Sequence, residues 1–365
     1  MEVEDKSTVV ISRIQAEIDK IDKNENNIYF FVIDTKGNPS GSLEYIYKLA
    51  LLLKRNDFNV TMLYQEDEFV GVREWLGDAY ADLPHEDISK DDVSVSPSDI
   101  LFIPELFSNI MTQTKKLPCK RIVILQNYDY ILEQMPLSVQ WGDLGIMEAI
   151  TNTDVNAELV KDIFPYIKTT TIDPYIDNMF GKTNEPKKLI INIVAKDQRD
   201  VNRIIKPFYW KFPMYKWVSF RDLRGFPKEL FAKCLREAAV TIWSDEATNF
   251  GYSALEAMKC GNIVLAKTPV QEQKWMVEDG DVNLKNCCVW FDSFHDVHKM
   301  IASVVRSWVT DNVPDVLGNV ADETVSKYTE QNTEAQIVKY IQGVLDTRKM
   351  EMRNLINEIN HGNNA

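Results

Sequence analysis

Residues 217–264 most constrain the fold of this chain, because they specify a strand, a loop, a helix and a second strand in direct succession. The run AVTIW at residues 239–243 is short, apolar and β-branched, which is typical of a buried parallel strand. After a polar loop, a helix is predicted over residues 252–259, and a Cys-Gly pair ends it before a strand at residues 262–266. This βαβ unit places a helix amino terminus, which favours anions, where open α/β sheets bind ligands.

Short apolar runs alternate with helical stretches along most of the chain. They predict further strands at residues 28–33, 59–64, 99–104, 121–125, 149–152, 169–172, 189–194 and 288–291. Such alternation favours parallel sheets with helices on both faces. A length of 365 residues suggests two domains, and the polar, proline-bearing run at residues 181–188 is typical of a linker between them.

Charge and composition argue against several classes of protein. A formal net charge of −14 disfavours a nucleic-acid partner and a polybasic membrane patch, since both depend on clustered Lys and Arg. The five cysteines, with Cys287 and Cys288 adjacent, form neither a disulfide nor a zinc pattern. The chain begins with acidic residues and has no apolar run of about 18 residues, so we expect no signal peptide and no integral membrane segment. A cytoplasmic protein is therefore expected.

A longer pattern in the central segment resembles a known signature. The residues that carry it are Phe250, Gly251, Leu255, Glu256, Ala257, Met258, Cys260 and Gly261, in the spacing FGxxxLEAMxCG. This pattern resembles the nucleotide-sugar signature of the retaining GT-B glycosyltransferases of family 4. Upstream of it, the family's G…EL…L…A pattern is matched by Gly225, Glu229, Leu230, Leu235 and Ala238. The resemblance is specific over residues 217–291, moderate over residues 149–180, and rests on strand order alone before residue 145.

The resemblance implies the GT-B architecture, an α/β fold in which two Rossmann-like, doubly wound parallel-sheet domains face each other across a cleft. The expected divisions are an N-terminal helical extension at 1–27, an acceptor-side domain at 28–180, an interdomain linker at 181–188, a nucleotide-sugar-binding domain at 189–325, and a C-terminal helix that crosses back, with a tail, at 326–365. One face of the extension carries Ile11, Ile14, Ile18 and Ile21. This stripe favours a helix packed on the body of the protein over a dimerising helix, although a homo-oligomer is left open.

The resemblance also implies a donor site on the second domain. Lys196 aligns with an arginine of the family that binds the donor pyrophosphate, and Arg199 or Arg203 would substitute for a lysine whose place is near Val201. Cations are needed there because a leaving nucleoside diphosphate accumulates negative charge in the transition state. The alternative is that these residues are solvent-facing charges at a helix start. Phe250, Gly251 and Tyr252 would lie against the diphosphate, and Glu256 would hold the ribose hydroxyls.

On the acceptor side, the loop after the first strand contains Gly37, Ser40 and Gly41, and a glycine-bearing loop between strand and helix lets a backbone approach phosphates or sugars. The family commonly has a histidine near the transferred sugar at the end of the strand at residues 121–125. Here Gln126 or Asn127 occupies that place, and capping of the next helix is an equal alternative for these residues.

The largest departure from the family concerns its E-x7-E pair. Glu256 is the second glutamate, but the first, which contacts hydroxyls of the donor sugar, is replaced by Thr248. Thr248 and its neighbour Asn249 are therefore expected beside the donor sugar, where a hydroxyl can make a hydrogen bond but carries no charge. Asp245 or Glu246 could reach into the site instead.

The sequence is best interpreted as a metal-independent glycosyltransferase that moves a sugar, with retention, from a nucleotide-diphosphate donor to a glycan, a lipid-linked sugar or a protein. No cofactor is expected beyond this donor substrate. One alternative is a non-catalytic GT-B homologue that serves as the binding partner of an active glycosyltransferase. Thr248, the missing histidine and the unmatched lysine position near Val201 favour it. Another is a non-hydrolysing sugar-nucleotide epimerase, for which no acid–base set can be assigned.

Overall fold

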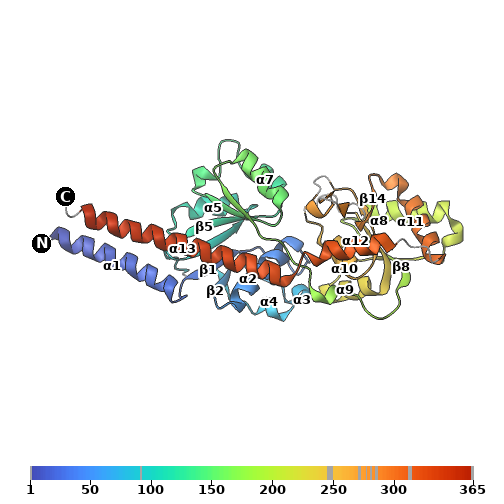
Figure 1. The fold of residues 1–365 in the computed structure, drawn as a ribbon, viewed down its shortest axis with the longest axis horizontal. Coiled ribbons are helices and arrows are strands. Elements are labelled where there is room, and N and C mark those ends of the chain that lie inside the picture. Colours follow the sequence, from blue (N-terminus) through green and yellow to red (C-terminus); the bar gives the residue numbers. More distant parts are fainter. Residues whose placement is uncertain are drawn as a thin grey trace.

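The chain contains two parallel β-sheets, each sandwiched between helices, which lie one after the other along the long axis of the molecule (Figure 1). The computed structural model describes residues 2–90, 93–244, 250–269, 273–276, 278–279, 282–283, 287–310 and 315–362. Two doubly wound parallel sheets confirm the predicted α/β class.

The first sheet has seven parallel strands in the order β3-β2-β1-β4-β5-β6-β7. Its strands are β1 (Asn27–Phe31), β2 (Asn59–Tyr64), β3 (His85–Asp87), β4 (Ile100–Pro104), β5 (Lys120–Leu125), β6 (Glu148–Thr151) and β7 (Lys168–Thr171). The helices of this domain are α2 (Gly41–Arg55), α3 (Arg73–Leu76), α4 (Asp78–Ala81), α5 (Ser108–Gln113), α6 (Tyr128–Gln134) and α7 (Asp154–Ile163), with 3-10 turns η1 (Thr114–Lys116), η2 (Gly142–Leu144) and η3 (Asn178–Phe180). All five residues of β4 are buried, as expected for a strand that helices cover on both faces.

The second sheet has five parallel strands in the order β14-β11-β10-β8-β9. Its strands are β8 (Lys188–Val194), β9 (Ser219–Asp222), β10 (Ala238–Trp243), β11 (Ile263–Lys267) and β14 (Val289–Phe291), and a small antiparallel pair is formed by β12 (Glu278–Asp279) and β13 (Val282–Asn283). Its helices are α8 (Gln198–Lys211), α9 (Lys228–Glu237), α10 (Tyr252–Lys259), α11 (Phe294–Val309) and α12 (Asp315–Ser326), with 3-10 turns η4 (Pro213–Tyr215) and η5 (Lys274–Met276). One apolar core lies under α8 and α11, and another lies under α9 and α10.

The chain crosses between the two domains twice. The first crossing follows β7, and the second joins α12 to the long helix α13 (Glu330–Gly362), which returns along the first domain (Figure 1). The two crossings touch, because the backbone N–H of Ile176 donates to the carbonyl oxygen of Tyr328 at 3.1 Å. Thr333, in the first turn of α13, also donates from its hydroxyl to the carbonyl oxygen of Asp173 at 2.7 Å.

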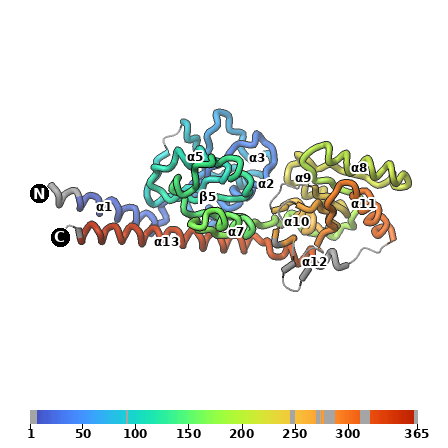
Figure 2. The backbone as a smooth tube through the Cα atoms, turned by 90° about the horizontal axis from the view of Figure 1, so that it is seen from above, coloured from blue at the N-terminus to red at the C-terminus, as the bar shows by residue number. Residues whose placement is uncertain are grey.

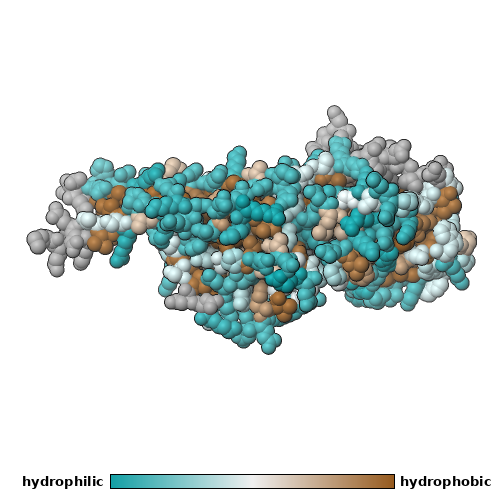
Figure 3. Space-filling model, turned by 90° about the horizontal axis from the view of Figure 1, so that it is seen from below, coloured by the Kyte–Doolittle hydropathy of each residue, from teal (hydrophilic) through white to brown (hydrophobic). Residues whose placement is uncertain are grey.

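Helix α13 pairs with the first helix, α1 (Glu2–Asp22), and both reach beyond the first domain, so that the two ends of the chain lie close together (Figure 2). Near the body, Ile18 and Ile21 of α1 are buried, at 1% and 6% exposure. Farther out, Val10 and Leu355 are 44% and 47% exposed, and Figure 3 shows apolar groups among polar ones at this end of the molecule. Within the described residues, no helix is both long and apolar enough to cross a membrane.

The burial of Ile18 predicts that α1 stabilises the first domain. Ile18→Ala should lower the free energy of unfolding in chemical denaturation by about 2–4 kcal/mol, because it removes methyl groups from a packed site. Val10→Ala, on an exposed part of the same helix, is the matched control and should change it by less than about 0.5 kcal/mol. Equal effects of the two substitutions would contradict this assignment.

Candidate functional site

The amino terminus of α10 is shaped by a glycine that no other residue could replace without strain. Gly251 is the N-cap residue and has a left-handed backbone, with φ 80°. A Cβ atom at this position would lie 2.8 Å from the Trp275 ring, so space as well as conformation requires a glycine. The Trp275 indole N–H donates to the carbonyl oxygen of Phe250 at 2.8 Å and holds the turn in place. The helix therefore presents its N–H groups at a rigid, aromatic-backed turn.

This turn meets the glycine-bearing loop of the first domain. A Cβ atom at Gly41 would lie 3.5 Å from a ring carbon of Tyr252, so the starts of α2 and α10 are in close approach. Ser40 caps α2, since its hydroxyl accepts from the N–H of Leu43 at 3.3 Å. Gly37 has φ +80° and lies at a turn beside Glu74. Of the three predicted loop residues, Gly41 is therefore the one in contact with the second domain.

A buried cluster of charged side chains joins the two domains beside the Gly41–Tyr252 contact. Lys228, at the start of α9, forms ion pairs with Glu44 of α2 and with Asp177 of the first crossing. Lys48 of α2 pairs with the same two carboxylates, at 2.7 Å and 3.0 Å, and its side chain is only 1% exposed. Burial acts to raise the pKa of Glu44, but the two ammonium groups hold it below the ordinary value. The two carboxylates and two ammonium groups compensate one another in a site with little access to water.

Glu256 lies beside this cluster, on the second turn of α10, and is 6% exposed. Burial and, after it, the charge of Glu44 raise the pKa of its carboxyl group to about 8, against the opposing effect of Lys228 and Lys48. At neutral pH this group is therefore mostly protonated, so it can donate one hydrogen bond and accept others. A carboxyl group of this kind is suited to a pair of ligand hydroxyls.

Lys196 and Arg199, which were predicted to bind phosphate, follow the carboxyl end of a strand in the second sheet, as α10 does. The carboxyl ends of β8 and β10 are neighbours, and the N–H of Ser244 donates to the carbonyl oxygen of Val194 at 3.0 Å. Lys196 follows β8 and is exposed. Arg199 is 82% exposed and pairs at 2.9 Å with Asp197, the capping residue of α8. A phosphate bound by Arg199 would compete with this exposed ion pair, which costs little to exchange.

Sequence reasoning missed a further cation at this edge. Arg224, in the loop after β9, donates to the carboxylate of Asp222 at 2.6 Å and to the side-chain oxygen of Gln198 at 2.6 Å. It therefore connects the loop after β9 to the start of α8. The sequence R-D-L-R at residues 221–224 was the available signal, but it does not reveal which helix the second arginine reaches.

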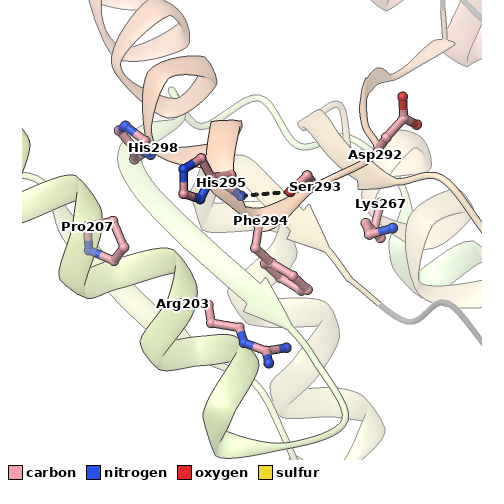
Figure 4. A pocket seen from close by; sticks show the side chains of 8 residues that line it. All are labelled: Arg203, Pro207, Lys267, Asp292, Ser293, Phe294, His295 and His298. Atoms are coloured by element: carbon pink, nitrogen blue, oxygen red, sulfur yellow. Dashed lines mark hydrogen bonds between the residues drawn. The ribbon is translucent and has the colours of Figure 1, made fainter.

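The alternative cation, Arg203, lies elsewhere. It points into a cavity of about 550 Å³ between α8, α11 and the ends of β11 and β14 (Figure 4). Its guanidinium group lies 5.5 Å from the centre of the Phe294 ring and pairs with Asp200 at 3.0 Å. The cavity is lined by Arg203, Pro207, Lys267, Asp292, Ser293, Phe294, His295 and His298. Arg203 is thus associated with α11 rather than with the start of α10.

Asn127 has a capping role in this structure. Its side chain accepts from the N–H of Asp129 at 3.0 Å at the start of α6, and its own N–H donates to Glu105 at 2.7 Å. Glu105 is buried, and burial raises its pKa to about 7 against the opposing effect of the N–H of Asn127. The neighbouring Gln126 donates from its side chain to the carbonyl oxygen of Ser42 at 2.9 Å. The contact of Asn127 with Asp129 agrees with the capping alternative, whereas Gln126 reaches the start of α2 instead; contact of Asn127 with a sugar stays a prediction.

Four residues with predicted roles, Asp245, Glu246, Thr248 and Asn249, lie outside the described residues. Their placement beside the donor sugar stays a prediction. In the described part of the chain, no group of three or more His, Cys, Asp or Glu side chains is arranged to hold a metal ion.

Comparison with known proteins identifies one curated relative and a common fold. No protein-family model matches the chain. An alpha-1,6-glucosyltransferase of Actinobacillus pleuropneumoniae serotype 7 (strain AP76) is 23% identical over 185 residues, which is 48% of this chain. The match spans about half of that relative's length, 54%.

Solved structures are similar over most of the chain. Sucrose-phosphate synthase from Thermosynechococcus elongatus has a TM-score of 0.64 at 11% identity and is matched over 88% of this chain and 100% of its own. The pneumococcal O-GlcNAc transferase GtfA, in complex with UDP and GlcNAc, has a TM-score of 0.62 at 9% identity, over 88% of this chain and 99% of its own. This likeness confirms the predicted GT-B fold.

The raised pKa of Glu256 predicts a pH-dependent stability. From the ordinary pKa of 4.5 to about 8, the folded chain retains a proton here that the unfolded chain has released. The free energy of unfolding therefore falls as pH rises through this window, since the folded state binds more protons. Glu256→Gln is neutral at every pH and removes this contribution. Thermal unfolding from about pH 5 to pH 8 should show the variant gaining stability relative to the wild type.

Glu158→Gln, which removes an exposed carboxylate from α7, controls for the change in net charge. It should follow the wild-type dependence on pH. A constant difference between Glu256→Gln and the wild type across this range would show that Glu256 is ionised in the folded chain.

Proposed function

We propose that this chain is a glycosyltransferase that moves a sugar from a nucleotide-diphosphate donor to a saccharide-bearing or other hydroxyl-bearing acceptor. The observation that carries the proposal is the meeting of the start of α10, at Gly251, with the glycine-bearing loop at Gly41, with Glu256 directly behind. The helices α2 and α10 each follow the carboxyl end of a strand, one in each sheet, and ligands of open parallel sheets bind at such ends. The relatives named above act on sugars, and one of them was solved with UDP.

In the proposed mechanism, the N–H groups at the start of α10 bind the diphosphate together with Lys196 and Arg199, and Arg224 adds to the positive charge of this edge. Oriented N–H dipoles and cations stabilise the charge that develops on the leaving nucleoside diphosphate. Glu256 holds the two ribose hydroxyls through its carboxyl group. Approach of the domains at the Gly41–Tyr252 contact excludes water, which protects the donor from hydrolysis.

Retention of configuration, membership of family 4 and independence of metal ions are parts of the same proposal that come from the sequence resemblance alone. Thr248 and Asn249 are proposed to lie beside the transferred sugar. Two observations support the non-catalytic alternative: Arg199 is paired with Asp197, and Asn127 is used as a cap. Turnover of a donor by the purified chain separates the two functions, whereas nucleotide binding alone does not. The cytoplasmic location, the domain divisions and a homo-oligomer stay predictions.

The role of Glu256 gives the first test of this proposal. Glu256→Ala should weaken binding of the preferred nucleoside diphosphate by about 1–3 kcal/mol, because hydrogen bonds to two ribose hydroxyls are lost at about 0.5–1.5 kcal/mol each. Isothermal titration with UDP, GDP and ADP measures this loss. Glu358→Ala, the same substitution at an exposed position of α13, is the control and should leave the affinity unchanged. If Glu256→Ala binds every nucleotide as tightly as the wild type, the ribose assignment is wrong.

The cations at the edge of the second sheet give a second test. If protein cations stabilise the leaving group, donor turnover should continue in EDTA at its initial rate. The measurement is the release of nucleoside diphosphate from a panel of nucleotide sugars with and without EDTA. Activity that EDTA abolishes and magnesium or manganese restores would contradict the metal-independent mechanism.

A further inference from the structure

A small cavity lies at the junction of the two domains, beside the start of α10. Its volume is about 40 Å³. The first domain and its crossings line it with Asn152, Thr153, Asp154, Asp173 and Tyr328, and the second domain with Phe250, Gln273 and Trp275. Because both domains contribute, the cavity is complete only when they are in contact.

Gln273 has an unusual environment in this cavity. The residue is 1% exposed, and neither the nitrogen nor the oxygen of its side-chain amide has a hydrogen-bond partner within the described structure. An amide buried in this way costs stability that an apolar side chain of similar volume would not. Gln336 offers the contrast, because its amide nitrogen and oxygen both bond to Asp173, at 2.9 Å and 2.7 Å. The unpaired amide of Gln273 therefore indicates a ligand that supplies the missing partners.

The walls of the cavity define what kind of group fits. Asp154 and Asp173 supply carboxylate oxygens, Asn152 and Gln273 supply amides, and Phe250 supplies an apolar aromatic surface. Acceptors, donors and an aromatic face together suit a group that both donates and accepts hydrogen bonds and carries C–H bonds. A volume of about 40 Å³ admits one such group, of the size of a hydroxyl or hydroxymethyl, rather than a whole sugar ring.

The position of the cavity connects it to the donor site. Trp275 forms part of its wall and also lies under Gly251, where a Cβ atom would come within 2.8 Å of the ring. A sugar attached to a diphosphate at the start of α10 therefore begins next to this cavity. We propose that the cavity receives a hydroxyl or hydroxymethyl arm of the transferred sugar, and that the amide of Gln273 helps to select the sugar. This inference rests on the proposed function and adds a specificity-determining residue to it.

The test replaces the amide by an apolar side chain of similar volume. Gln273→Met should raise the melting temperature of the ligand-free protein by about 1–3 °C, because it removes an unpaired buried amide. The same variant should bind the preferred nucleotide sugar about three- to tenfold more weakly, the loss expected for one hydrogen bond, while its affinity for the matching nucleoside diphosphate stays within about twofold. Calorimetry with UDP, GDP and ADP and with glucose, N-acetylglucosamine and mannose conjugates of these nucleotides measures both affinities.

Gln336→Met is the matched control, since it removes an amide that is fully paired with Asp173, and it should lower the melting temperature. Gln273→Asn keeps the amide but shortens the side chain. It should also weaken binding of the nucleotide sugar more than binding of the nucleotide. A lower melting temperature for Gln273→Met would overturn the inference, because the amide would then be satisfied within the protein. The inference would also be overturned if neither Gln273 variant changed the ratio of the affinity for the nucleotide sugar to the affinity for the nucleoside diphosphate. If the wild-type chain binds the nucleotides but no nucleotide sugar, the inference fails; if it binds neither, the proposed function fails with it.

Discussion

Two lysines that share two carboxylates fix the geometry of the junction between the domains. Lys228 comes from α9 of the second domain, and its partners Glu44 and Asp177 come from the first domain and the first crossing. Removal of one member would leave buried charges without compensation, which is costly, so the cluster favours one relative position of the domains over others. The Gly41–Tyr252 contact, the burial of Glu256 and the cavity at Gln273 all depend on that position. The charge cluster at the junction therefore also determines the geometry of the candidate site.

Local structure was predictable where a short stretch of sequence contains its own start and stop signals. The helix predicted at residues 252–259 agrees with α10, because a glycine precedes it, another follows it and its apolar residues keep a helical period. The predicted strand at residues 239–243 agrees with β10 to within one residue for a similar reason. Helix α12 had no comparable signal in its mixed sequence and was not predicted. The first helix begins at Glu2, ahead of the apolar stripe on which its prediction rested, since polar residues can continue a helix without leaving a periodic apolar pattern.

The candidate site was harder to predict, because its properties come from residues that are far apart in the chain. Glu256 could be found by its motif, but its protonation depends on its burial and on the charge of Glu44, which is more than 200 positions away. The capping role of Asn127 was weighed as an alternative and could be chosen only when its contact with Asp129 was seen. Gln273 could not be singled out at all. A glutamine in a loop is ordinary in sequence, and only the burial of its amide without a partner makes it informative.

The two chain crossings also determine how the cleft can open. They are joined by the hydrogen bond between Ile176 and Tyr328, so the domains are connected at one narrow place by two backbones rather than one. A single connection would let the second domain swivel freely, whereas a paired connection resists torsion and leaves bending as the soft motion. Helix α13 continues from this place along the first domain, so it lies on that domain's side of the connection. Opening of the cleft would therefore require bending at this paired connection, and helices α1 and α13 extend from the first domain in the direction away from it.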